Sequence, residues 1–116
     1  MNMLEELKGL GVNVDEALKR LGGNEAFYKK MLGRIQSMLE ETTVNPEFDA
    51  NDYQEVIENA HAIKGATGNL SLTPLYKAYT DIVDLLRQGS PEEARKILVD
   101  ILPVQAQIIE VINKYK

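Results

Sequence analysis

Apolar residues recur at intervals of three and four along almost the whole of this 116-residue chain, and this spacing limits the possible folds more than any other feature. It is the period of an α-helix with one buried face, and no strand-like alternation persists beyond a few residues. The clearest stretch is residues 24–43, whose apolar positions are Phe27, Tyr28, Met31, Leu32, Ile35, Met38 and Leu39. We therefore expect an all-α protein.

Capping residues and helix breakers divide the pattern into four long helices, predicted over residues 24–43, 52–70, 73–88 and 90–114. Asn24 is a good N-cap, while Thr73-Pro74 and Ser90-Pro91 each pair a capping residue with a proline at the first helical position. Pro103 interrupts the last helix, but the apolar spacing continues across it. We therefore expect one kinked helix there.

Two short helices are predicted before the long ones. The first covers residues 2–8, and the second is capped by Asp15 and ended by Gly22-Gly23. Four long amphipathic helices with short loops predict an antiparallel up-down-up-down four-helix bundle, with the short helices capping one end. A chain of this length fits a single domain over residues 1–116.

The composition excludes several classes of function. The chain has no cysteine, which excludes disulfides and thiolate metal sites. A net charge of -5 without a basic block argues against nucleic acid or an anionic membrane surface as the main partner. No apolar run approaches the ~20 residues of a membrane span, and the acidic beginning does not resemble a signal peptide. We therefore expect a cytoplasmic protein.

The single histidine, His61, lies within the predicted helix 52–70. At about 100° per residue, it points away from the apolar face of that helix, which is formed by Val56, Ala60, Ile63, Thr67 and Leu70. Lys64 lies beside it, three residues on. Its charge would disfavour the protonated imidazole and would attract an anion to the ring nitrogen. The pattern predicts an exposed, nucleophilic imidazole.

Three other residues on the same outer face are unusual. Gly65 and Gly68 each cost about 1 kcal/mol relative to alanine in a helix interior, so their presence suggests that something approaches closely. Ile57 is an apolar side chain one turn before His61, and a partner would bury it. Taken singly, these are ordinary features, because helical glycines often serve packing and apolar residues are common on surfaces.

The segment AHAIKGATGNLSLTPLYKA resembles the signature of histidine-containing phosphotransfer (Hpt) domains, which is His-x-x-Lys-Gly followed by small residues. The upstream VDEALKRLGGNEAFYKKML resembles the segment before the family's first long helix. The resemblance covers roughly residues 12–115. The chain departs from the family at Ser71, where glycine is common, and at Thr80-Asp81, where Leu-Glu is frequent. Neither departure removes a reacting group.

The resemblance implies a phosphocarrier in a two-component phosphorelay, not an enzyme. His61 would accept a phosphoryl group from a receiver aspartate or a sensor histidine kinase and pass it to another receiver. Lys64 would stabilise the phosphoryl charge. Ile57, Gly65 and Gly68, with the outward residues of helix 24–43, would form the docking surface. The receiver supplies the metal ion, so we expect no cofactor or metal site in this chain, and a monomer.

Other interpretations stay open at this point. The chain could be an adaptor of Hpt shape that carries no phosphate, or the phosphate-accepting part of a chemotaxis-type kinase. Glu58-x-x-His61 has the spacing of a di-iron motif, although that site needs two such pairs projecting inward. The acidic run from Glu40 to Glu58 has no lysine or arginine. It is either a solvated segment or a charge filter among receivers.

Overall fold

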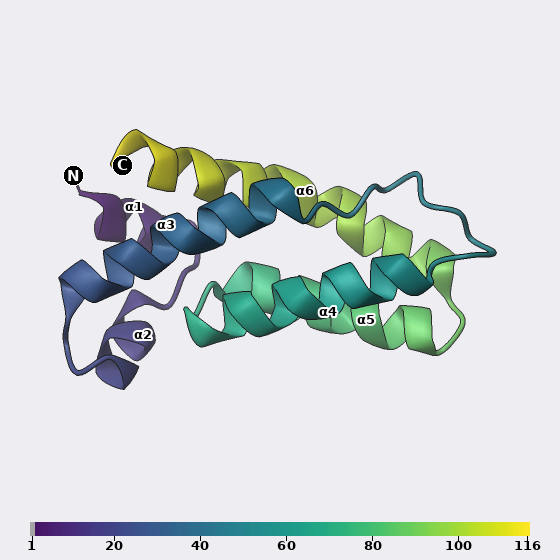
Figure 1. Cartoon of the computed structure of the whole chain (residues 1–116), viewed down its shortest axis with the longest axis horizontal. Helices are drawn as coiled ribbons and strands as arrows, with labels where there is room; N and C mark the ends of the chain where they lie inside the picture. The colour runs from purple at the N-terminus through teal and green to yellow at the C-terminus, as the bar shows by residue number, and fades with distance from the viewer. Residues whose placement is uncertain (1) are drawn as a thin grey trace.

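The structure is a computed structural model that describes residues 2–116, and these residues form six α-helices without a strand (Figure 1). They are α1 (Met3–Gly9), α2 (Val14–Arg20), α3 (Glu25–Glu41), α4 (Gln54–Asn69), α5 (Thr73–Arg87) and α6 (Pro91–Lys114). The all-α prediction is confirmed. Each predicted long helix is present, and its ends differ from the predicted ones by two residues at most.

The four long helices alternate in direction along the bundle (Figure 1). α4 and α5 form a tight antiparallel hairpin, α6 packs along α5, and α3 contacts both α6 and α4. The short helices α1 and α2 lie at the end of the bundle where α3 begins and α6 ends. The predicted up-down-up-down helical bundle, capped at one end by the short helices, is confirmed.

One apolar core runs through the bundle, and its largest buried side chains come from all four long helices. Among those with almost no exposed surface are Tyr28, Leu32, Ile63, Leu75, Ile82 and Leu98. Tyr79 donates its buried hydroxyl to Gln105 Oε1 at 2.5 Å, which links α5 to α6. Burial raises the pKa of Tyr79 to about 12. A buried hydroxyl with a partner avoids the cost of an unpaired polar group.

The local details of three helices differ from the sequence expectations. The N-cap of α2 is Asn13, whose side chain accepts from the Glu16 amide, so the prediction of Asp15 was wrong. α5 begins at Thr73 after Leu72, without a side-chain cap. Phe27 is 43% exposed instead of buried. The buried line of α3 is Tyr28, Leu32, Ile35 and Leu39, and Phe27 lies one position to its side.

Two further predictions are confirmed, namely the Asn24 cap of α3 and the continuity of the last helix across Pro103. The Asn24 side chain caps α3 by accepting from the Phe27 amide at 3.0 Å. α6 continues as a single helix through Pro103, whose missing amide proton removes one hydrogen bond without ending the helix.

The acidic loop between α3 and α4 is held against α6 by Arg95. The Arg95 guanidinium donates to the carbonyl oxygens of Pro46 and Phe48, and it lies 4.2 Å from the centroid of the Phe48 ring. Phe48 in turn meets Tyr53 edge to face at 6.3 Å. The loop therefore has a fixed path to the start of α4, although its carboxylates at Glu47, Asp49 and Asp52 are exposed.

Within residues 2–116, no helix has the length and apolar character needed to cross a membrane.

Candidate functional site

His61 lies near the middle of α4 and is exposed. The buried face of the helix is formed by Ala60, Ile63 and Thr67, as the periodicity predicts. Thr67 donates its hydroxyl to the Ile63 carbonyl at 2.7 Å, so this polar residue is satisfied within the helix. The imidazole therefore points away from the core, and the outward orientation predicted from the sequence is confirmed.

The exposed face of α4 forms one side of a groove of about 650 Å³. α5 forms the opposite side and α2 closes the end. From α4 the groove is lined by His61, Lys64, Gly65, Gly68 and Asn69; from the other elements it is lined by Asn13, Glu16, Arg20, Ser71, Thr73, Tyr76 and Lys77. The histidine and the lysine that the sequence singled out thus share one open cavity with side chains that lie far from them in the chain.

Positive charge dominates this groove. Its one lining carboxylate, Glu16, is occupied: it lies 2.6 Å from the Arg20 guanidinium and accepts the Ser71 hydroxyl at 2.8 Å. The Ser71 hydrogen bond is the largest cause of the lowered pKa of Glu16; burial opposes it, and Arg20 lowers the pKa further. Lys64 and Lys77 form no ion pair with any residue in the described part of the chain. Two uncompensated ammonium groups therefore line the groove that contains His61.

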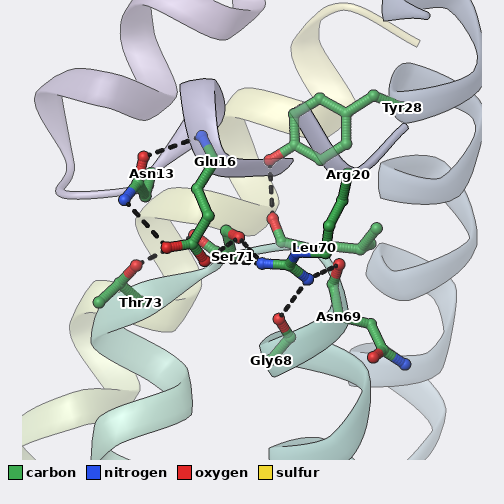
Figure 2. A network of polar contacts seen from close by, with 9 residues as sticks. All are labelled: Asn13, Glu16, Arg20, Tyr28, Gly68, Asn69, Leu70, Ser71 and Thr73. Atoms are coloured by element: carbon green, nitrogen blue, oxygen red, sulfur yellow. Dashed lines mark hydrogen bonds and ion pairs between the residues drawn. The ribbon is translucent and has the colours of Figure 1, made fainter. Parts of the chain in front are cut away.

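The end of α4 is fixed by side chains from α2 and α3 (Figure 2). Arg20 Nη1 donates to the carbonyl oxygens of Gly68 at 3.2 Å and Asn69 at 2.7 Å, and the buried Tyr28 hydroxyl donates to the Leu70 carbonyl at 2.8 Å. The last carbonyls of a helix have no partner within it, and a cation there also complements the helix dipole. These contacts fix the helix that carries His61 to the rest of the bundle.

The structure shows how the chain accommodates Ser71, which is one of its departures from the Hpt signature. Its φ of 56° is in the left-handed region, which favours glycine. Here the serine hydroxyl gains two partners, because it accepts from Arg20 Nη2 at 2.5 Å and donates to Glu16. The Ser71 carbonyl accepts from the Asn13 amide at 3.0 Å. A serine therefore makes this left-handed turn, and its hydroxyl joins α2 to the end of α4 (Figure 2).

The two glycines of α4 have different surroundings. At Gly65 an added Cβ would meet no atom within 4 Å, so nothing inside the chain requires a glycine there. At Gly68 an added Cβ would lie 2.8 Å from Cδ1 and 2.9 Å from Cε1 of the Tyr76 ring. The packing of α4 on α5 therefore accounts for Gly68 without any partner. Its docking role stays a prediction.

Ile57 is only partly available to a partner. It is half-buried and packs against the hydrophobic core, one turn before His61. The sequence placed it on the outer face, and the structure places it at the edge of that face. Its role in docking also stays a prediction.

A model of the Hpt domain family matches residues 4–113, which is nearly the whole chain. The chain belongs to the Hpt domain family. Hpt domains act as phosphocarriers in phosphorelay signalling and interact with receiver domains and histidine kinases. No curated protein and no solved structure gives a significant match to this chain.

The di-iron interpretation finds no support in the geometry of this Hpt domain. Glu58 and His61 are both exposed, whereas the motif needs carboxylates and histidines that project into the bundle. Within residues 2–116, no group of three or more acidic or histidine side chains is placed to hold a metal ion.

Sequence reasoning missed the residues that line the groove from outside α4, among them Arg20, Tyr76 and Lys77. Arg20 reaches residues 48 to 51 positions away, a contact with no local pattern. Tyr76 and Lys77 follow from the short turn between α4 and α5. That turn makes the helices antiparallel neighbours, so the first turns of α5 face the second half of α4. Projecting α5 onto α4 would have placed both residues beside the histidine face.

Proposed function

We propose that His61 is the phosphorylated residue of this Hpt domain, and that it carries the phosphoryl group between aspartates of receiver domains or from a sensor histidine kinase to a receiver. The observation that carries the proposal is an exposed imidazole on α4 in a groove whose uncompensated charges are positive. An unprotonated ring nitrogen forms a bond to phosphorus while the bond from phosphorus to the aspartate oxygen breaks. The carboxylate leaves, and the reverse step transfers the group onward.

The surroundings of His61 suit this chemistry. Phosphoryl transfer is driven by in-line positioning and by neutralisation of charge on the phosphoryl oxygens. Lys64 lies three residues after His61 on the same helix face and has no competing carboxylate in the described part of the chain. In this proposal Lys64 stabilises the phosphoryl group. The receiver supplies the aspartate and its metal ion.

The docking surface in this proposal includes both exposed faces beside His61. At Gly65 the space beside α4 is open, whereas at Gly68 the Tyr76 ring packs against the helix. On the side towards α3, a second groove is lined by Met31, Arg34, Ile35, Met38, Ala66, Asn69 and Leu70, and Phe27 is exposed one turn before it. Transient signalling contacts are small and combine apolar centres with polar rims. The half-buried Ile57 would add to the edge of this surface.

The test is transfer from a panel of phosphorylated receiver domains of the source genome to the wild-type chain and to His61→Gln. We expect label on the wild type that is lost in acid and kept in alkali, and none on the variant. Circular dichroism of both proteins checks the fold. If no receiver transfers label to the folded wild type, the adaptor alternative replaces this proposal, and receiver binding without transfer would support it.

A matched pair of variants tests the docking surface separately. Gly65→Gln places a long side chain where the chain itself leaves space, so we expect transfer from a receiver to slow at least about tenfold. Gly33→Gln in α3 is the control, because it makes the same change at a glycine that lines neither groove. Equal transfer rates for the two variants would contradict the docking role of Gly65. Sedimentation and cell fractionation test the monomeric state and the cytoplasmic location that belong to the same proposal.

A further inference from the structure

Lys77 is the second free cation of the groove that contains His61. It lies on α5, is exposed, and donates no hydrogen bond and forms no ion pair within residues 2–116. An exposed lysine without a carboxylate partner is common. Lys77, however, lines the same cavity as His61 and Lys64. It therefore adds positive charge at the place where an anion would be held.

The packing of α4 on α5 determines which part of α4 lies opposite Lys77. The Tyr76 ring lies against Gly68, where it leaves no room for a Cβ. Because the helices are antiparallel, moving forward along α5 from this contact corresponds to moving back along α4, from Gly68 towards Lys64 and His61. Lys77 is the next residue of α5. Its flexible stem therefore begins beside the stretch of α4 that presents Lys64 and the histidine.

Arg20, the other cation that lines the groove, is already occupied. Its guanidinium donates to two carbonyl oxygens at the end of α4, to the Ser71 hydroxyl and to the Glu16 carboxylate. Moving it towards a phosphoryl group would leave these acceptors unpaired. The Lys77 ammonium group on α5 is therefore available to an anion in the groove, whereas the Arg20 guanidinium on α2 is not.

We propose that Lys77 is a second phosphate-contacting residue of this Hpt domain, which approaches the phosphoryl group on His61 from α5 while Lys64 approaches it from α4. The inference rests on the proposed function of His61. A phosphoryl group presents three acceptor oxygens and up to about two negative charges, which two ammonium groups on opposite sides of the groove can match.

The test uses phosphoramidate, a small phosphoryl donor that needs no partner protein. In the reaction, the bond between phosphorus and His61 forms as the bond between phosphorus and ammonia breaks, and ammonia leaves. The rate of loading is followed for wild type, Lys77→Gln, Lys77→Arg and His61→Gln. The matched control is Lys96→Gln, which removes the same charge from an exposed lysine of α6 outside the groove.

We expect Lys77→Gln to load about fivefold more slowly than Lys96→Gln, the factor that one cation contributes at ~4 Å under solvent-like screening. Lys77→Arg should keep most of the rate, because it keeps the charge. Added salt should slow the wild type more than Lys77→Gln. Melting temperatures should match, because Lys77 is exposed and donates no hydrogen bond within the described chain; this separates a charge effect from a folding effect.

Two outcomes overturn the inference, and they are distinguishable. If His61 is loaded but Lys77→Gln behaves like Lys96→Gln, Lys77 does not contact the phosphoryl group and the proposed function still stands. If neither phosphoramidate nor any receiver loads His61 in the folded wild type, the proposed function fails and the role of Lys77 fails with it.

Discussion

The two glycines of α4 should respond in opposite ways to the same substitution. At Gly65, alanine adds a better helix former in open space, so Gly65→Ala should stabilise the fold by up to about 1 kcal/mol. At Gly68 the added Cβ would overlap the Tyr76 ring at 2.8 Å, and overpacking of this kind costs about 1–3 kcal/mol. Gly68 lies in the last turn of α4, so the gain in helix propensity there is smaller. We expect a net destabilisation of about 1–2 kcal/mol.

Urea unfolding monitored by circular dichroism measures both changes, and about 2 kcal/mol should separate the two variants. The decisive control is the Tyr76→Ala background, which removes the ring that the new methyl group would meet. In that background Gly68→Ala should lose its penalty, so the double-mutant cycle should report a coupling of about 1–2 kcal/mol. If Gly68→Ala is as stable as Gly65→Ala in the presence of Tyr76, or if removing Tyr76 leaves its penalty unchanged, the packing explanation of Gly68 is refuted.

Three further predictions concern residues that hold the helices and the loop between α3 and α4 in place. Ser71→Gly relieves the left-handed backbone while losing the hydroxyl contacts, whereas Ser71→Ala loses those contacts and keeps a φ of 56°; urea unfolding should therefore find Ser71→Ala the less stable by about 1 kcal/mol, and the reverse order would contradict this account. Burial raises the pKa of Tyr79 to about 12 from 10.0, so its contribution to the free energy of unfolding is complete below pH 10 and is lost as the pH rises towards 12. The free energy of unfolding should therefore fall less steeply over that range in Tyr79→Phe than in the wild type. Equal slopes would refute the assignment. Arg95→Ala should speed hydrogen exchange in residues 42–53 and leave exchange in α5 unchanged, whereas unchanged exchange in the loop would show that Arg95 does not hold it.

The helices and the outward direction of His61 could be predicted from the sequence because both depend on local periodicity. The buried line of Tyr28, Leu32, Ile35 and Leu39 follows the same rule. Phe27 was misjudged because adjacent rows of apolar residues on one helix look alike in sequence, and only the neighbouring helices decide which row is covered. Asp15 and Asn13 are both good N-caps, and the backbone begins its turn at the earlier one.

The contacts that hold the end of α4 in place could not be predicted in the same way. The contacts of Arg20 with the end of α4 and of Tyr28 with Leu70 join residues more than forty positions apart, and no spacing rule connects them. The sequence singled out Ser71 as a departure from the Hpt signature that the chain resembles. It did not show that the hydroxyl would bridge Glu16 and Arg20. Gly68 was unusual in the sequence for a reason that only the position of the Tyr76 ring supplies.

The most direct test of the central claim is to locate the phosphoryl group after the chain is mixed with a phosphorylated receiver domain. Tandem mass spectrometry at alkaline pH, which preserves the bond between phosphorus and nitrogen, assigns the modified residue. The account predicts a single phosphoryl group on His61 and none after His61→Gln. A phosphoryl group on any other residue, or a folded wild-type chain that takes none from any receiver of the panel, would contradict it.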